Sequence, residues 1–391
     1  MFYKTNPILN KDDKMKFRKF TNLFSLLIIC LFTFIAVSCK KGDTEPDSSI
    51  LTPEVITKLQ AAADKVMMNS QTPGMIAYIG VEGESEGLSI TRGVSNLVTN
   101  EPMNISNYFR IGSITKTFTS EAVLILADEG KIDLNKSISF YLPDLIIPSG
   151  DKITIRMLGN MTSGLYNYTD DNDFWTSIIN SHGQVVFTPE QLVAMAIKLP
   201  IQFEPGTKFS YSNTNYILLG LLIQKVTGKS AKDVINEKIL QPLGMKNTFW
   251  PNTSYLPYPY THGYSFEIDN SLTDVTNWNP SWADAAGCLI SNFSDLKIWA
   301  KEGSERKLLS DKMKIERFTW VDGDFPGVTS SGFGLEKAYD WIGHVGSLPG
   351  YNSQLFYNPI KKITIIINTN STDGYPASIT FGAFISILTP I

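Results

Sequence analysis

The stretch Phe109-Arg-Ile-Gly-Ser-Ile-Thr-Lys-Thr-Phe118 contains a serine and a lysine at the start of a predicted helix. The apolar pattern predicts this helix over Thr117–Glu129, and Gly130 ends it. Ser113 therefore lies at or just before the helix N-terminus. Lys116 lies on the same face, with about 5–6 Å between the two Cβ atoms. A serine hydroxyl is a poor nucleophile unless a base lies within hydrogen-bond reach. Lys116 is a candidate for that base.

Two further strings follow in order along the chain, Tyr211-Ser-Asn213 and His344-Val-Gly346. Ser-x-x-Lys by itself carries little information, because the same pattern also begins at Ser38, Ser149, Ser294 and Ser304. Tyr-x-Asn occurs only at Tyr211. The order and the local context of the three strings indicate that they contribute to one site.

Tyr211 is a second candidate base. A phenol ordinarily titrates near pH ~10, and a neighbouring lysine ammonium favours its ionised form. The sequence leaves open whether Lys116 or Tyr211 takes the serine proton, and we expect the pair to titrate as one unit. Asn213 is placed on the same extended segment, where its amide can bind a substrate carbonyl.

The third string has the composition of a strand. His344 and Gly346 then face the same side, and Gly346 allows a substrate backbone to approach closely. His344 titrates near neutral pH, so it is suited to binding a substrate carboxylate or relaying a proton. The backbone N–H groups of Ser113 and Ser347 are the predicted oxyanion hole, whose donors typically contribute about 2.7–4 kcal/mol each.

The fold class predicted is α/β (α+β), with an antiparallel sheet built from both ends of the domain and flanked by helices. The N-terminal part supplies a helix over about residues 52–70 and strands at Gly74–Val81 and Leu88–Val94. The C-terminal part supplies three strands and a closing helix, at Trp341–Val345, Tyr351–Tyr357, Ile363–Asn368 and Pro376–Ile387. A mainly helical lobe is inserted at about residues 131–250, within one domain at residues 51–391. The site is expected at the junction of lobe and sheet.

At these residues the chain resembles the serine β-lactamase-like family, which includes class C β-lactamases, low-molecular-weight D-alanyl-D-alanine carboxypeptidases and related esterases. The resemblance extends to the blocks Pro73–Gly80, Phe203–Asn215 and Leu240–Met245. It implies an α/β sandwich carrying a helical lobe, and an acyl-enzyme formed at Ser113. The chain departs from the family in two places. His344-Val345 stands where class C enzymes have lysine and threonine, and Met161 begins the block usually written His-Thr-Ser-Gly-Leu.

The leading hypothesis is an envelope serine hydrolase that acts on D-amino-acid peptides related to peptidoglycan stems, as D-alanyl-D-alanine carboxypeptidases do. Val345 has no hydroxyl for a substrate carboxylate, which argues against strict D-Ala-D-Ala specificity. The alternatives are a β-lactamase or small-ester hydrolase with the same residues, and a sensor module that binds penicillin without turnover. The expected partners are accordingly a small peptide, a β-lactam or an ester.

The N-terminus has the pattern of a secretion signal at residues 1–38, with Met15 as the expected start. Basic residues precede an apolar run from about Phe24 to Val37, which is shorter than the roughly 20 residues of a membrane span. Cys39 follows Ser38 as in the lipobox of bacterial lipoproteins, so we expect lipid attachment at Cys39, a tether at residues 39–50 and a periplasmic or outer-membrane location. An ordinary secreted protein or an uncleaved anchor are the alternatives.

Composition excludes several other classes. Net charge is -4, and the body of the chain has no basic run, which argues against a nucleic-acid partner. His182, His262 and His344 are far apart and lack metal-ligand spacing, so neither a metal site nor a cofactor is expected. Cys288 lies in an apolar context and is predicted to be a buried, unreactive thiol.

Overall fold

The computed structural model describes residues 49–391, apart from 85, 267–270, 306, 326–327 and 390–391. The predicted signal peptide, the lipid-attachment position Cys39 and nearly all of the predicted tether lie outside the described residues. Among the residues described, no helix combines the length and the apolar character needed to cross a bilayer.

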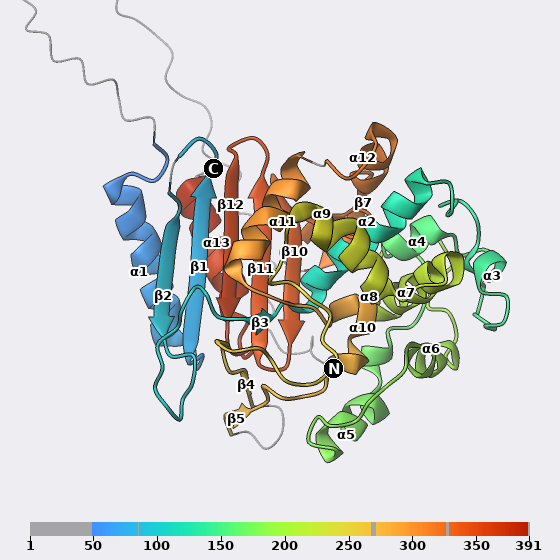
Figure 1. Ribbon diagram of the computed structural model, residues 1–391, viewed down its shortest axis with the longest axis horizontal. Helices are drawn as coiled ribbons and strands as arrows, with labels where there is room; N and C mark the ends of the chain where they lie inside the picture. Colours follow the sequence, from blue (N-terminus) through green and yellow to red (C-terminus); the bar gives the residue numbers. More distant parts are fainter. Residues whose placement is uncertain (1–48, 85, 267–270, 306, 326–327, 390–391) are drawn as a thin grey trace, which may run out of the picture. The chain divides into compact units, whose positions relative to one another are not determined.

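Over the described residues, one eight-stranded sheet has the order β2-β1-β12-β11-β10-β9-β8-β7, with antiparallel neighbours throughout (Figure 1). The N-terminal part contributes β1 (Gly74–Val81) and β2 (Leu88–Gly93). The C-terminal part contributes β7 (Val321–Phe325), β8 (Val328–Ser331), β9 (Glu336–Ala338), β10 (Trp341–Leu348), β11 (Tyr351–Asn358) and β12 (Ile363–Thr369). The predicted antiparallel sheet built from both ends of the domain is confirmed.

The sheet buries both faces, because successive side chains of a strand point to opposite sides. On β1, Met75, Ala77 and Ile79 pack into a cluster with α1 (Pro53–Asn69) and α13 (Pro376–Leu388). Ile76 of the same strand belongs to the core cluster of the other face, together with residues of α11 (Phe293–Glu305). The Thr52 side chain caps α1 by accepting from the Val55 N–H at 3.3 Å.

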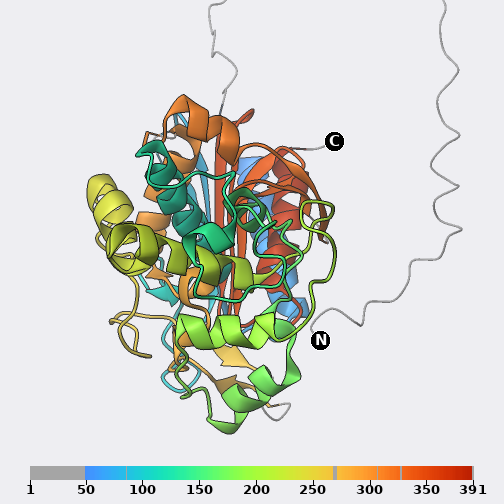
Figure 2. The same ribbon diagram turned by 90° about the vertical axis from the view of Figure 1, so that its right-hand side faces the viewer.

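The chain between β3 (Phe109–Arg110) and its partner β6 (Ile290–Ser291) carries the helical lobe. Figure 2 shows this lobe from its outer side. Its helices are α3 (Ile138–Tyr141), α4 (Ile155–Gly159), α5 (Asn172–Asn180), α6 (Pro189–Ile197), α7 (Asn213–Thr227), α8 (Ala231–Ile235) and α9 (Gln241–Leu243), with short turns η3 (Tyr168–Asp170) and η4 (Asn236–Leu240). Residues 214–223 of α7 are all buried, so this helix is the centre of the lobe. The predicted inserted lobe is confirmed.

The remaining elements connect the lobe and the sheet. They are η2 (Gly112–Ile114), α2 (Thr115–Asp128), β4 (Tyr264–Ser265), β5 (Thr273–Asp274), η5 (Pro280–Trp282), α10 (Asp284–Gly287) and α12 (Asp311–Arg317). Helix α2 is buried along nearly all of its length, and it runs between α7 and the sheet (Figure 1). Cys288 follows α10 and is buried, as predicted. Burial also raises the pKa of its thiol, which keeps it protonated and unreactive.

Candidate active site

Ser113 lies in the turn η2, which leads directly into α2. Gly112 has a φ of 55°, a conformation that favours glycine. A methyl group at Gly112 would lie 2.7 Å from the backbone nitrogen of Ser347, so the turn is packed tightly against β10. This packing holds Ser113 where the sheet, α2 and the lobe meet.

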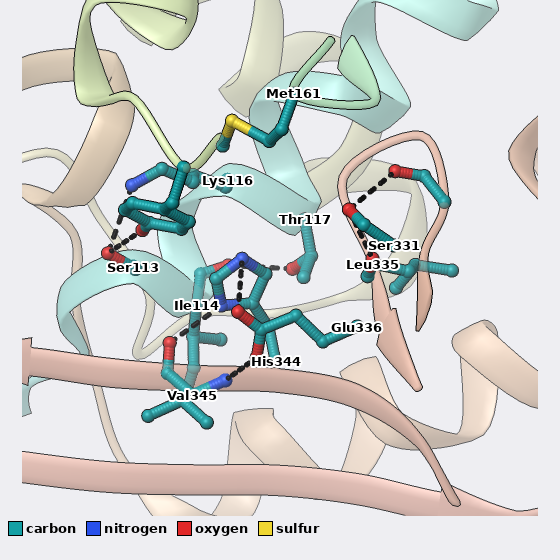
Figure 3. Close-up of polar contacts among 12 residues, drawn as sticks. Ser113, Ile114, Lys116, Thr117, Met161, Ser331, Leu335, Glu336, His344 and Val345 are labelled. Atoms are coloured by element: carbon teal, nitrogen blue, oxygen red, sulfur yellow. Dashed lines mark hydrogen bonds and ion pairs between the residues drawn. The ribbon is translucent and has the colours of Figure 1, made fainter. Parts of the chain in front are cut away.

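Lys116 is fully buried on the first turn of α2. Its amine lies 2.9 Å from Ser113 Oγ (Figure 3). It also lies 2.7 Å from Asn213 Oδ1 and 2.7 Å from the carbonyl oxygen of Ala286. The Asn213 and Ala286 oxygens can only accept hydrogen bonds. They accept hydrogen bonds from two N–H groups of Lys116 whether the amine is charged or neutral. The remaining position on the nitrogen, a third N–H or a lone pair, faces Ser113 Oγ.

Burial lowers the pKa of Lys116 well below the usual value for lysine, and the nearby Glu336 carboxylate partly opposes that shift. In the neutral amine, two N–H groups bind Asn213 and Ala286. The lone pair is then directed at Ser113 Oγ. The geometry therefore allows Lys116 to accept the serine proton.

Tyr211 reaches the same oxygen from the lobe. Its hydroxyl donates to Ser113 Oγ at 2.8 Å, and the Lys116 amine lies 4.9 Å from the centre of its ring. The extended residue Ser212 joins Tyr211 to α7, so the buried helix holds the phenol in place. The structure thus brings together the three side chains that the sequence predicted as nucleophile and candidate bases.

Asn213 has a different role from the one predicted. It is the first residue of α7, and both ends of its amide are engaged within the protein. Its Oδ1 accepts from Lys116, and its Nδ2 donates to Thr169 Oγ1 at 3.1 Å. Asn213 therefore orients the lysine rather than offering a free amide to substrate.

His344 also differs from its predicted role of binding a substrate carboxylate or relaying a proton. It is 3% exposed, and its Nδ1 donates to the Val345 carbonyl oxygen at 2.6 Å. Its Nε2 lies 3.7 Å from Oε1 of Glu336, which belongs to β9 (Figure 3). Burial, followed by the charge of Lys116, lowers the pKa of His344 to about 3. The imidazole is therefore neutral and cannot attract a carboxylate.

Gly346 and Ser347 of β10 border Ser113 through the backbone. A side chain at Gly346 would collide with the carbonyl oxygen of Ile111. The space that the sequence assigned to an approaching substrate is therefore filled by the chain itself. The Ser347 nitrogen lies next to the turn that carries Ser113, which suits the predicted pair of oxyanion donors.

Sequence reasoning missed two contributors. The Ala286 carbonyl binds Lys116 through its backbone, which leaves no trace in residue type. Glu336 is 7% exposed and accepts a hydrogen bond from the Val345 N–H at 3.0 Å. The signal that could have found it is a lone acid at the end of the apolar stretch Gly332-Phe-Gly-Leu-Glu336, where β9 begins.

An antiparallel sheet, an inserted helical lobe and a Ser–Lys–Tyr cluster at their junction agree with the β-lactamase fold. Residues 59–380 match the protein family described as Beta-lactamase. This match covers most of the chain, and the chain belongs to that family.

Several known proteins resemble the chain. The protein flp of Staphylococcus aureus (strain NCTC 8325 / PS 47) is 28% identical over 274 residues, which cover 68% of this chain and 53% of that protein. The D-aminopeptidase of Brucella anthropi is 26% identical over 332 residues, which cover 81% of this chain and 59% of the relative. The chain thus spans little more than half the length of these curated relatives. The crystal structure of a D-stereospecific amidohydrolase from Streptomyces sp. superposes with a TM-score of 0.76 and 31% identity, covering 86% of this chain and 98% of that one.

Proposed function

We propose that the protein hydrolyses amide bonds in short peptides or amides of D-amino acids, through an acyl-enzyme at Ser113. The observation that carries this proposal is the position of Ser113 Oγ, 2.9 Å from the buried amine of Lys116 and 2.8 Å from the Tyr211 hydroxyl. A hydroxyl between two groups that can exchange protons is the arrangement that nucleophilic catalysis requires.

The first half of the reaction forms an ester. Ser113 Oγ attacks the carbonyl carbon while its proton passes to the neutral amine of Lys116. The backbone N–H groups of Ser113 and Ser347 stabilise the resulting oxyanion. The C–N bond then breaks as Tyr211 donates its proton to the leaving amine, and Lys116 returns a proton to the phenol. In the second half, Tyr211 or Lys116 takes a proton from the attacking water, the C–O bond of the ester breaks, and the same proton passes to Ser113 Oγ as the acid leaves.

The substrate class follows from what faces the serine and from the relatives. His344 is buried and neutral, and Val345 carries no hydroxyl, so this part of β10 supplies no side chain that would select a C-terminal carboxylate. A D-stereospecific amidohydrolase and a D-aminopeptidase are among the similar proteins. Both observations favour D-configured amides and peptides over strict D-alanyl-D-alanine carboxypeptidase activity.

A substrate panel tests this assignment. We expect a D-Ala-D-Ala peptide with an amidated C-terminus to be cleaved at least as fast as the same peptide with a free carboxylate, and the L-configured amide to be cleaved far more slowly. Product release measured by mass spectrometry gives kcat/KM for each. A strong preference for the free carboxylate would support a carboxypeptidase instead. Faster turnover of nitrocefin or p-nitrophenyl esters than of any amide would support the β-lactamase or esterase alternative.

We also propose that the protein is exported and anchored in the cell envelope by a lipid on Cys39. The basis is the sequence alone: a basic segment, a short apolar run and a cysteine at the predicted cleavage point. Expression in a bacterium followed by fractionation checks it. Wild type should sediment with membranes, and the Cys39→Ala variant should appear in the soluble fraction. Equal distribution of the two would rule out the anchor.

A further inference from the structure

A small cavity lies behind Tyr211. Its volume is ≈ 10 Å³, room for about one water molecule. Tyr211 and Phe209 line it on the lobe side, and Glu336 and His344 line it on the side of the sheet. A buried carboxyl group therefore lies within the same cavity as one of the groups that contact the nucleophile.

Glu336 is held in a fixed position. Its Oε2 accepts from the Val345 N–H at 3.0 Å, and its Oε1 faces His344 Nε2 at 3.7 Å (Figure 3). Among the described residues, His344 places the nearest ring nitrogen beside Glu336, and because the imidazole is neutral this contact is not an ion pair. The other titratable groups facing it are Lys116 from α2, and Tyr211 and Tyr216 from the lobe.

The pair with His344 is neutral at acidic pH. Burial raises the pKa of Glu336 to about 7, and burial lowers that of His344 to about 3. Between these values the proton is on the carboxyl group and the imidazole is neutral. As Glu336 ionises, its negative charge favours the protonated form of Lys116, and a protonated Lys116 favours the ionised form of Glu336. The charge states of Glu336 and Lys116 are therefore coupled.

We propose that Glu336 is a positioning residue that controls the protonation of Lys116 from behind Tyr211, without contacting substrate. This inference rests on the proposed function, since Lys116 must lose its proton before it can activate Ser113. The neutral ring of His344 packs beside the carboxyl group, and the Val345 N–H holds that group at the cavity. The charge of a group outside the substrate cleft then sets the pH at which the nucleophile becomes active.

Glu336→Gln tests this control because glutamine keeps the shape and the acceptor for Val345 but carries no charge. In wild type, the acidic limb of the kcat/KM profile should spread over two coupled steps. In the variant it should collapse to a single step, shifted to lower pH by up to about one unit. The direction is the same if Tyr211 rather than Lys116 is the base, because removing a negative charge favours the deprotonated form of either group.

A second readout does not depend on turnover. ¹³C NMR of lysine-labelled protein follows the Lys116 Cε signal, which is identified by its absence from the Lys116→Met variant. We expect the Lys116 titration to move to lower pH in Glu336→Gln. The matched control is Lys337→Gln on the same strand, since Lys337 points to the opposite face and its amine lies over the Trp320 ring. This control should leave both titrations unchanged.

The outcomes separate this inference from the proposed function. Unchanged Lys116 titration and an unchanged pH profile in Glu336→Gln would overturn the control by Glu336, even if hydrolysis depends on Ser113. Activity that survives Ser113→Ala would overturn the proposed function, whereas a shifted NMR titration would still show that Glu336 governs the proton on Lys116.

Discussion

Replacing Ser113 with alanine is expected to abolish covalent labelling by a fluorescent penicillin and to lower kcat/KM for amide hydrolysis by at least about 10⁴-fold. The reason is that no acyl-enzyme can form without the hydroxyl that lies between Lys116 and Tyr211. Lys116 and Tyr211 remain in the variant but have no nucleophile to activate. Intact-mass measurement of the labelled protein, followed by peptide mapping, locates the adduct.

The matched control is Ser149→Ala, which removes the serine of another Ser-x-x-Lys pattern. Its lysine, Lys152, is largely exposed and pairs with Glu204 at 2.9 Å, so it is not placed to activate a hydroxyl. This variant should keep full labelling and activity. Labelling that persists in Ser113→Ala, or that maps to another residue, would show that the acyl-enzyme assignment is wrong.

The second large effect is expected from Lys116→Met, which removes the amine but keeps a long apolar side chain in the buried site. General acid–base groups contribute about 10²–10⁴-fold, and kcat/KM should fall by that amount. Steady-state kinetics with the best substrate of the panel measures this loss. The corresponding control is Lys152→Met, which alters an exposed lysine and should leave kcat/KM unchanged.

The same variant should change the pH dependence of stability. Burial holds the pKa of Lys116 well below its usual 10.5, so the unfolded chain binds this proton more tightly than the folded protein does. Wild type therefore gains stability as pH rises from the folded-state pKa of Lys116 toward 10.5, by up to about 1.4 kcal/mol per pH unit. Lys116→Met lacks this pH-dependent contribution to the free energy of unfolding. Urea unfolding of both proteins at several pH values from 7 to 10 checks it, and a difference that does not vary with pH would contradict a lowered pKa.

Local patterns predicted much of the fold correctly. The helix over residues 52–70 was marked by a Thr-Pro start and apolar spacing, and α1 covers Pro53–Asn69. The strands of both ends were marked by apolar runs between turn residues, and they pair in one sheet. These signals are short-range, because capping, periodicity and turn chemistry depend on neighbouring residues.

The strands β7, β8 and β9 were not predicted. Their segments contain Asp322, Gly323 and Ser330, which have weak strand preference, and their extended conformation comes from pairing across the sheet to β10. Without β9, the sequence offered no reason to place Glu336 near Lys116. A pairing between separate segments of the chain depends on tertiary context that propensity does not contain.

Around the nucleophile, too, the sequence predicted some features and only the tertiary structure decided others. Residue types and spacing alone identified Ser113, Lys116 and Tyr211, because this chemistry needs a hydroxyl and two proton-exchanging groups within reach. Only the tertiary structure decided that Asn213 binds Lys116, that the Ala286 carbonyl completes the lysine's partners, and that His344 turns toward Glu336. The physical reason is burial by segments that are distant in the sequence. Buried polar atoms must pair with one another, and burial disfavours the charged form of each titratable group.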